Sequence, residues 1–276
     1  MPLDDRVRAS AVAIRQAILR ASRRANRGHI GSALSVADLV AGIVHALDLG
    51  RRPEEDRDRF VLSKGHAALA YYAGLQQVGI LGSSALDEFC ADGSRLATHP
   101  DRGVPGVSFS TGSLGLGVSY SVGSALAARL RGSSRRTVAL MSDAELNCGL
   151  TWEALMFAAH HRLHRFQIVI DLNGSQAFGA TSDVLDLRPI AARLEAFGFR
   201  VDEIDGHDPR QIREALEMPA DGDRRPRATV ASTKLGHGVS FMEGRLEWHY
   251  RPMTDDQYHQ AMLEVGPSCD ERSSTR

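Results

Sequence analysis

The sequence predicts an α/β protein with a doubly wound parallel sheet flanked by helices, in one domain of residues 1–266. Three observations support this fold class. Two short segments, residues 137–142 and 166–172, are apolar almost throughout, as strands covered on both faces are. Segments of strand character alternate with helical patterns along the chain. The chain has 276 residues and is 43% hydrophobic, which is enough for one sizeable core.

The N-terminal part of the chain is predicted to form two helices. Apolar residues in segment 7–24 recur with helical spacing, and Asp4 or Asp5 is the expected N-cap. This spacing gives the first helix an apolar face of Val7, Ala11, Ile14, Ala17 and Ile18. A glycine turn then leads into a second, more apolar helix over residues 28–47.

The rest of the chain continues the alternation. A strand, a turn at Gly65 and a helix are expected over residues 58–79. Further helices are expected over residues 118–132, from Glu145 onward, and over 186–198, and further strands over 199–205 and 228–233. Between them, residues 89–117 are rich in Gly, Ser and Pro and too long for an ordinary connection, which predicts a functional loop. The polar tail of residues 267–276 is expected to be disordered.

Composition excludes several classes of protein. The net charge of −1 argues against a nucleic-acid-binding protein. No apolar run reaches the length of a membrane span, and the N-terminus lacks the apolar core of a signal peptide. The three cysteines form no Cys-x-x-Cys pair, which favours a reduced, cytoplasmic setting. The glycine-rich segment 112–123 matches neither the dinucleotide-binding nor the phosphate-loop fingerprint.

Polar residues follow the two apolar strands at the centre of the chain. Asp143 follows the first and Asn173 the second, and adjacent parallel strands end at the same edge of a sheet. A carboxylate, an amide oxygen and the main-chain carbonyl of Ser175 are ligands that suit Mg²⁺. The simpler interpretation is that Asp143 caps the helix from Glu145 onward and that Asn173-Gly174 forms an ordinary turn.

Four histidines lie in short turns that contain glycine or proline rather than inside helices. These are His29, His66, His99 and His249. Histidines in such turns are well placed to reach a ligand, and imidazole exchanges protons near neutral pH. A second pattern, His160 and His164 four residues apart, has the spacing of a zinc-binding pair on a helix, but no glutamate follows His160.

The central segments, ELNCGLTWEALMFAAHHRL followed by DLNGSQAFGAT, resemble the transketolase family, and more closely the separate N-terminal half of a split transketolase. The resemblance implies the thiamine diphosphate-binding fold. It also implies that Mg²⁺ binds Asp143, Asn173 and Ser175, and that the cofactor diphosphate lies near Ser142, Asp143, Ala144 and Glu145.

The same resemblance implies roles for the turns and histidines. His29 and His99 match the family histidines that contact the hydroxyls of the ketose. His66 and His249 match those near the diphosphate and the reacting carbon. The segment TGSLGLG matches the turn that receives the aminopyrimidine ring, which assigns Gly112, Ser113 and Leu114 to cofactor binding.

The implied activity is transfer of a two-carbon ketol unit from a ketose, or its phosphate, to an aldose-type acceptor. The family activates its cofactor with a glutamate from a pyrimidine-binding domain. We therefore expect this chain to be inactive alone and to work with a separate partner chain, as a two-plus-two heterotetramer. The alternatives are the α subunit of a 2-oxoacid dehydrogenase and a degenerate, non-catalytic scaffold subunit.

Three departures from the family pattern bear on these expectations. Ser142 and Ala144 replace the two glycines of a Gly-Asp-Gly element, so small side chains lie where the backbone approaches phosphate. Cys148 replaces a glutamate that links paired active sites in the family. His237 occupies a position where the family prefers lysine.

Overall fold

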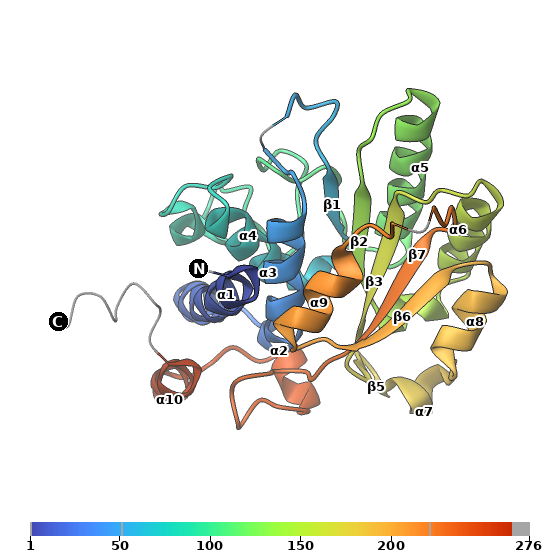
Figure 1. The fold of residues 1–276 in the computed structure, drawn as a ribbon. Coiled ribbons are helices and arrows are strands. Elements are labelled where there is room, and N and C mark those ends of the chain that lie inside the picture. Colours follow the sequence, from blue (N-terminus) through green and yellow to red (C-terminus); the bar gives the residue numbers. More distant parts are fainter. Residues whose placement is uncertain (1, 51, 221, 267–276) are drawn as a thin grey trace.

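The computed structural model describes residues 2–50, 52–220 and 222–266, so the tail that was expected to be disordered lies outside the described residues. A five-stranded parallel sheet forms the centre (Figure 1), in the order β1-β2-β3-β7-β6. Its strands are β1 (Arg59–Leu62), β2 (Thr137–Ser142), β3 (Phe166–Leu172), β6 (Arg200–Asp205) and β7 (Arg227–Ser232). The predicted fold class is confirmed.

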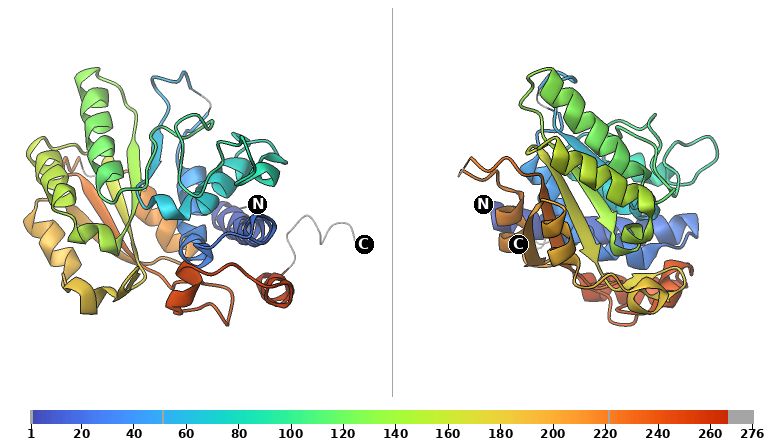
Figure 2. Two further views of the ribbon diagram at one scale, coloured as in Figure 1. Left: turned by 180° about the vertical axis from the view of Figure 1, so that it is seen from behind. Right: turned by 90° about the vertical axis from the view of Figure 1, so that its right-hand side faces the viewer.

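Helices cover both faces of this sheet (Figure 2). One side carries α1 (Leu3–Ala25), α2 (Ile30–Ser35), α3 (Ala37–Ala46), α4 (Ala68–Gln77), α9 (Pro209–Leu216) and α10 (Asp255–Val265). The other carries α5 (Leu116–Leu130), α6 (Gly149–His160) and α8 (Ile190–Ala196). A small hairpin, β4 (Ser175–Gln176) and β5 (Gly179–Ala180), leads into α7 (Thr181–Leu185). Short 3-10 helices are η1 (Gly65–Ala67), η2 (Ala85–Glu88), η3 (Asp143–Asn147) and η4 (Leu246–His249).

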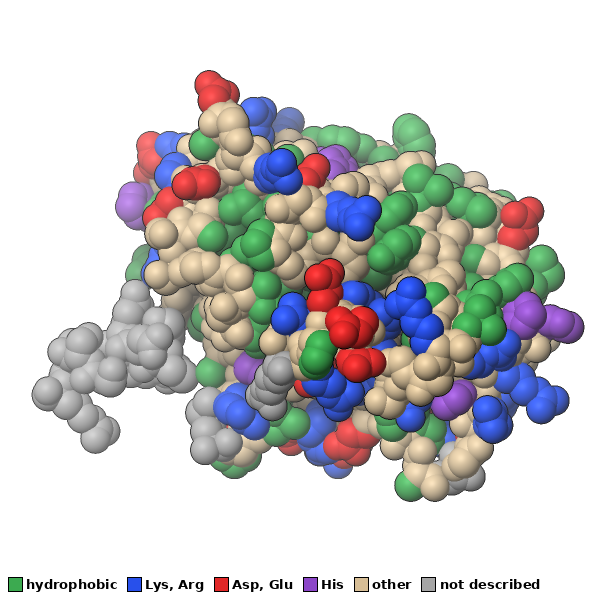
Figure 3. All heavy atoms as spheres, turned by 90° about the horizontal axis from the view of Figure 1, so that it is seen from above, with side chains coloured by type: hydrophobic (Ala, Val, Ile, Leu, Met, Phe, Trp, Pro, Cys, Tyr) green, Lys and Arg blue, Asp and Glu red, His purple; other side chains and the backbone are tan. Residues whose placement is uncertain are grey.

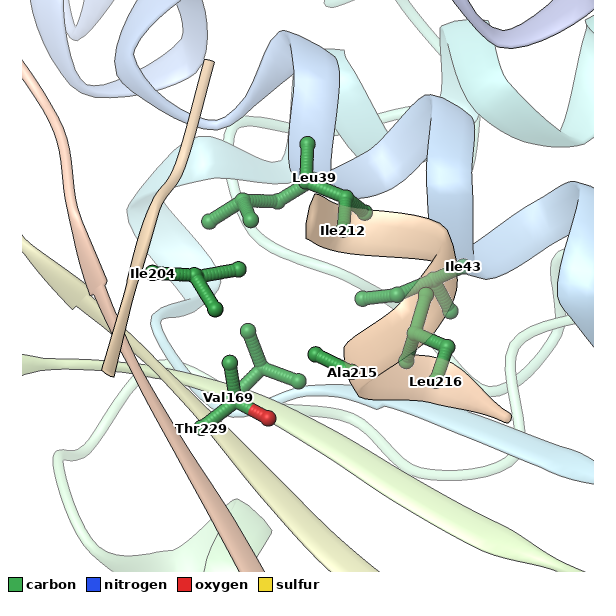
Figure 4. Close-up of a pocket in the computed structure, with 8 residues that line it drawn as sticks. All are labelled: Leu39, Ile43, Val169, Ile204, Ile212, Ala215, Leu216 and Thr229. Atoms are coloured by element: carbon green, nitrogen blue, oxygen red, sulfur yellow. The ribbon is translucent and has the colours of Figure 1, made fainter. Parts of the chain in front are cut away.

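The apolar strands feed two cores because successive side chains on a strand point to opposite faces. In β2, Val138 and Leu140 join the core under α3, whereas Ala139 and Met141 join the core under α5 and α6. Figure 4 shows the first of these cores, where side chains from α3 and α9 meet those of β3, β6 and β7 around a small apolar pocket. This pocket is a part of the core.

Several local expectations were wrong. The single helix expected over residues 28–47 is divided into α2 and α3, which meet at Val36. The helix α1 begins at Leu3 after Pro2, so Asp4 and Asp5 lie in its first turn instead of capping it. There they still favour the helix, because acidic groups interact well with its positive end. The helix expected over residues 186–198 begins only at Ile190, because Pro189 disfavours helical backbone at the residue before it.

The face at the amino ends of the strands is shown in Figure 3. Acidic and basic side chains are interspersed on it, with apolar side chains between them. No described helix is long and apolar enough to cross a membrane. The carboxyl ends of the strands lie at the opposite edge, at the bottom of Figure 1, where the hairpin, α7 and α2 gather.

Candidate functional site

The turns after β2 and β3 meet at the carboxyl edge of the sheet. The two strands pair in parallel, so their ends are neighbours. The main-chain N–H of Gly174 donates to Asp143 Oδ2 at 2.9 Å. The predicted meeting of these two turns is therefore confirmed.

Asp143 is a buried carboxylate that interacts with the nearby Lys64 charge without pairing with it. Its oxygens accept hydrogen bonds from the N–H of Ala144 (2.8 Å) and the hydroxyl of Thr181 (3.1 Å), as well as from Gly174. In the described part of the chain it forms no salt bridge. Burial, and then the nearby Asp171 carboxylate, raise the pKa of Asp143 to about 6. A buried carboxylate with a raised pKa suits a bound cation, because the cation compensates the carboxylate for its lost solvation.

Asn173 is held so that its two ends face different ways. Its Nδ2 donates to Asp171 Oδ2 at 2.8 Å, and its Oδ1 accepts from the N–H of Ser175 at 2.9 Å. One lone pair of Oδ1 is left for a further partner. The structure thus places an amide oxygen beside the Asp143 turn, and it also contains the Asn173-Gly174 turn of the simpler interpretation.

A buried ion pair lies beneath this turn, and the sequence interpretation missed it. Lys64, in the turn after β1, is fully buried and pairs with Asp171 at the end of β3. A signal was present, because Lys64 is one of only two lysines in the chain and directly follows a strand. The pair fixes the acceptor to which Asn173 donates.

The four histidines that lie in short turns come close to one another in the structure. The ring centroid of His29 lies 5.0 Å from that of His249, 5.9 Å from that of His66 and 6.2 Å from that of His99. His66 and His249 are 5.2 Å apart. These residues come from four separate segments, so only the tertiary structure brings them together.

All four imidazoles are held in the neutral form at pH 7. Burial lowers the pKa of His29, His99 and His66, with His66 well below its ordinary value. Burial, then His29 and Lys64, lower the pKa of His249 to about 4. Neutral imidazoles can donate or accept hydrogen bonds with sugar hydroxyls. The Nδ1 of His29 is buried and has no partner in the described structure, which leaves it available to a ligand.

The predicted aminopyrimidine turn packs directly against the turn after β1. A Cβ on Gly65 would lie 2.9 Å from the main chain of Thr111 and Gly112, so only glycine allows this contact. Gly112 in turn lies beside His99. Ser113 is exposed and Leu114 is half-buried.

Glu145 holds three of these turns together. It is fully buried, and its carboxylate accepts from the Ser63 hydroxyl and from the N–H groups of Gly115 and Ser142, both at 2.9 Å. Ser142 and Glu145 form the capping box of η3, so Asp143 is the first residue of η3 and does not cap it. Through these three hydrogen bonds Glu145 positions the turns that form the site.

The remaining candidates lie outside this cluster. The helix α6 ends at His160, so His164 does not share a helical face with it, and the spacing of a zinc-binding pair does not lie on a helix. Cys148 is the half-buried residue before α6, and burial raises the pKa of its thiol. The ring of His237 stacks on that of His207, with centroids 3.6 Å apart.

Comparisons with known proteins agree with this geometry. Residues 7–273 match a family model described as transketolase, thiamine diphosphate binding domain. One subunit of the apulose-4-phosphate transketolase of Actinobacillus succinogenes is 35% identical over 268 residues, which cover 95% of this chain and 96% of that protein. One subunit of the 6-deoxy-6-sulfo-D-fructose transketolase of a Clostridium species is 34% identical, covering 91% and 93%.

Solved structures show the same likeness over a part of their length. The transketolase of Campylobacter jejuni superposes with a TM-score of 0.86 at 28% identity and covers 96% of this chain. That of Leishmania mexicana gives a TM-score of 0.86 at 29% identity and covers 97%. This chain spans 43% and 42% of those two proteins, respectively.

Proposed function

Because the chain belongs to the transketolase family, as its thiamine diphosphate-binding domain, we propose that it is the cofactor-binding subunit of a two-component transketolase. It moves a two-carbon ketol unit from a ketose, or its phosphate, to an aldose-type acceptor. The observation that carries this proposal is the meeting of four neutral histidines with the Asp143 and Asn173 turns at one sheet edge.

The residues present fit the cofactor and its metal. Asp143 and the Oδ1 of Asn173, with the main-chain carbonyl of Ser175, offer the oxygen ligands that Mg²⁺ requires. Main-chain groups of Ser142 and Ala144 lie next to the metal ligands and would hold the diphosphate. The turn of Gly112, Ser113 and Leu114 would receive the aminopyrimidine ring.

The histidines would handle the sugar. When bound, thiamine diphosphate supplies the nucleophilic carbon that carries the two-carbon unit. His29 and His99 would bind hydroxyls of the ketose, and His66 and His249 would exchange protons near the reacting carbon. Their depressed pKa values keep them neutral, so each has a free lone pair that can accept a proton from the substrate and then return it.

A separate partner chain would complete the site. The two relatives described above carry the word subunit in their names. In this chain, large apolar side chains are exposed beside the site: Leu116 and Leu150 at the starts of α5 and α6, Phe178 in the hairpin, and Val184 and Leu185 on α7. Phe178, at 87% exposed, is the most exposed of these five, and exposed apolar side chains that gather in one region mark a surface for a partner. We propose that the partner is a pyrimidine-binding subunit, in a two-plus-two assembly.

The test uses the full chain, by itself and with a candidate pyrimidine-binding subunit. Calorimetric titration with Mg²⁺ and thiamine diphosphate should show binding to the mixture, and ketol transfer should require both chains. Absence of cofactor binding would favour a scaffold role, and decarboxylation of 2-oxoacids would favour the dehydrogenase alternative. Replacing Phe178 with Asp should weaken association, whereas Leu263→Asp, an exposed leucine on α10, should not.

A further inference from the structure

The loop that follows β7 lies between the candidate metal site and a second polar cluster. On the site side, the hydroxyl of Thr233 donates to Asp171 Oδ1, which also accepts from Ser35 at 2.7 Å. These two donors occupy Oδ1, so Lys64 and Asn173 both use Oδ2. The position of Thr233 therefore helps to decide how the amide of Asn173 is turned.

On the other side, the same loop is tied to His207. The main-chain N–H of Lys234, the residue after Thr233, donates to His207 Nε2 at 3.0 Å. His207 Nδ1 lies 2.8 Å from Asp38 Oδ2, and Asp38 is buried and paired with Arg15. Since an N–H must meet a lone pair, Nε2 is unprotonated, and the proton is on Nδ1, where it is donated to Asp38.

This assignment decides against a metal ion in the cluster. The ligand atoms of Asp38, His207 and His237 lie within 4.8 Å of one another, as in some metal sites. However, Nδ1 of His207 carries a proton and the lone pair of Nε2 accepts the hydrogen bond of the Lys234 N–H, so neither nitrogen has a free lone pair. The rings of His207 and His237 are also stacked with an interplanar angle of 22°, and in-plane lone pairs of stacked rings do not converge on one ion.

We propose that His207, oriented by Asp38, is a positioning residue for the cofactor's metal site. It acts through the main chain of Lys234, which sets Thr233 on Asp171 and thereby the amide of Asn173. This inference rests on the proposed function. Groups of this kind, one contact removed from a metal ligand, typically change metal affinity by about 10-fold to 100-fold when they are lost.

Two substitutions separate the two bonds of His207. In His207→Asn the shorter side chain can still donate to Asp38 but does not reach the N–H of Lys234. In His207→Gln the amide oxygen lies near the place of Nε2, so it can accept from Lys234 while the bond to Asp38 is lost. His259→Asn, at an exposed histidine on α10, is the matched control.

The measurement is the affinity of the assembled protein for thiamine diphosphate at saturating Mg²⁺, beside kcat at saturating cofactor. We expect His207→Asn to weaken cofactor binding about 10-fold, with kcat nearly unchanged, and His207→Gln to weaken it much less. Equal weakening by both variants would indicate a purely structural role and overturn the proposal, as would native affinity in His207→Asn.

A second readout does not depend on the cofactor. In the full chain without ligand, hydrogen exchange at the Lys234 amide should accelerate in His207→Asn and stay slow in His207→Gln. If the native protein bound no cofactor, the proposed function would fail, but this exchange pattern would still test the hydrogen bond between His207 and the Lys234 amide. Unchanged exchange in His207→Asn would show that this hydrogen bond does not hold the loop, and would overturn the proposal.

Discussion

Asp143 should destabilise the metal-free chain at neutral pH. Its pKa is about 6 in the folded chain and close to the ordinary 3.8 when unfolded, so the folded state binds this proton more tightly. Stability from this group is therefore present below about pH 4 and is lost as pH rises towards 6. The difference between the two pKa values corresponds to about 3 kcal/mol. A cation bound at this carboxylate would offset that loss of stability.

The substitution Asp143→Asn removes this titration. Without metal, the free energy of unfolding of the variant minus that of the native chain should rise by about 2 to 3 kcal/mol between pH 4 and pH 7. The hydrogen bonds that the amide cannot make are lost equally at every pH, so they do not contribute to the change of this difference with pH. Urea denaturation at a series of pH values, with a chelator present, measures it.

Adding Mg²⁺ and thiamine diphosphate should make the native chain more stable than Asp143→Asn at pH 7. The native chain, with its partner, gains about 2.7 kcal/mol at a ligand concentration 100 times Kd, and the variant gains little. Asp183→Asn, at an exposed carboxylate on α7, should show neither effect. A pH-independent difference between native and Asp143→Asn would refute the reasoning, because the carboxylate would then not be strained.

Three further outcomes are expected. Lys64→Met should lower the free energy of unfolding in urea by about 3 to 5 kcal/mol, because it leaves the buried Asp171 carboxylate without its ion-pair partner. The double variant with Asp171→Asn should regain a part of that stability. Gly65→Ala should lower the free energy of unfolding by about 1 to 3 kcal/mol, because its Cβ would lie 2.9 Å from the main chain of Thr111. It should also weaken cofactor binding measured by calorimetry. Gly82→Ala, with open space around it, should change neither quantity. His249 stays neutral in the folded chain down to about pH 4, whereas in the unfolded chain it gains a proton near pH 6.5. The free energy of unfolding should therefore fall as pH drops from 6.5 to 4. His249→Asn should reduce this fall by about 1 kcal/mol, after allowance for the partial exposure of the side chain.

Two features of the fold were missed, one with a clear signal in the sequence and one without. The helix α9 starts with Pro209 after Asp208, whose side chain caps it, and this is a recognisable helix start. Its apolar residues Ile212 and Leu216 pack under α3. The short hairpin β4 and β5 has only two residues in each strand and gives no periodic pattern.

The sequence by itself determined the sheet and the chemical groups at its edge. Continuous apolar runs made β2 and β3 buried strands, and the residues after a parallel strand necessarily lie at one edge, which placed Asp143 beside the Asn173 turn. Histidines in glycine turns marked the residues most able to reach a ligand.

Only the tertiary structure decided which polar groups pair. Lys64 meets Asp171 across 107 residues and His207 meets Asp38 across 169, and no local pattern encodes such partners. Pairing and protonation depend on burial, because a charge that leaves water takes its partner, its tautomer and its pKa from whatever the fold places beside it. The sequence determines which residues are present at the site, and the packing around them determines their protonation state and the orientation of their side chains.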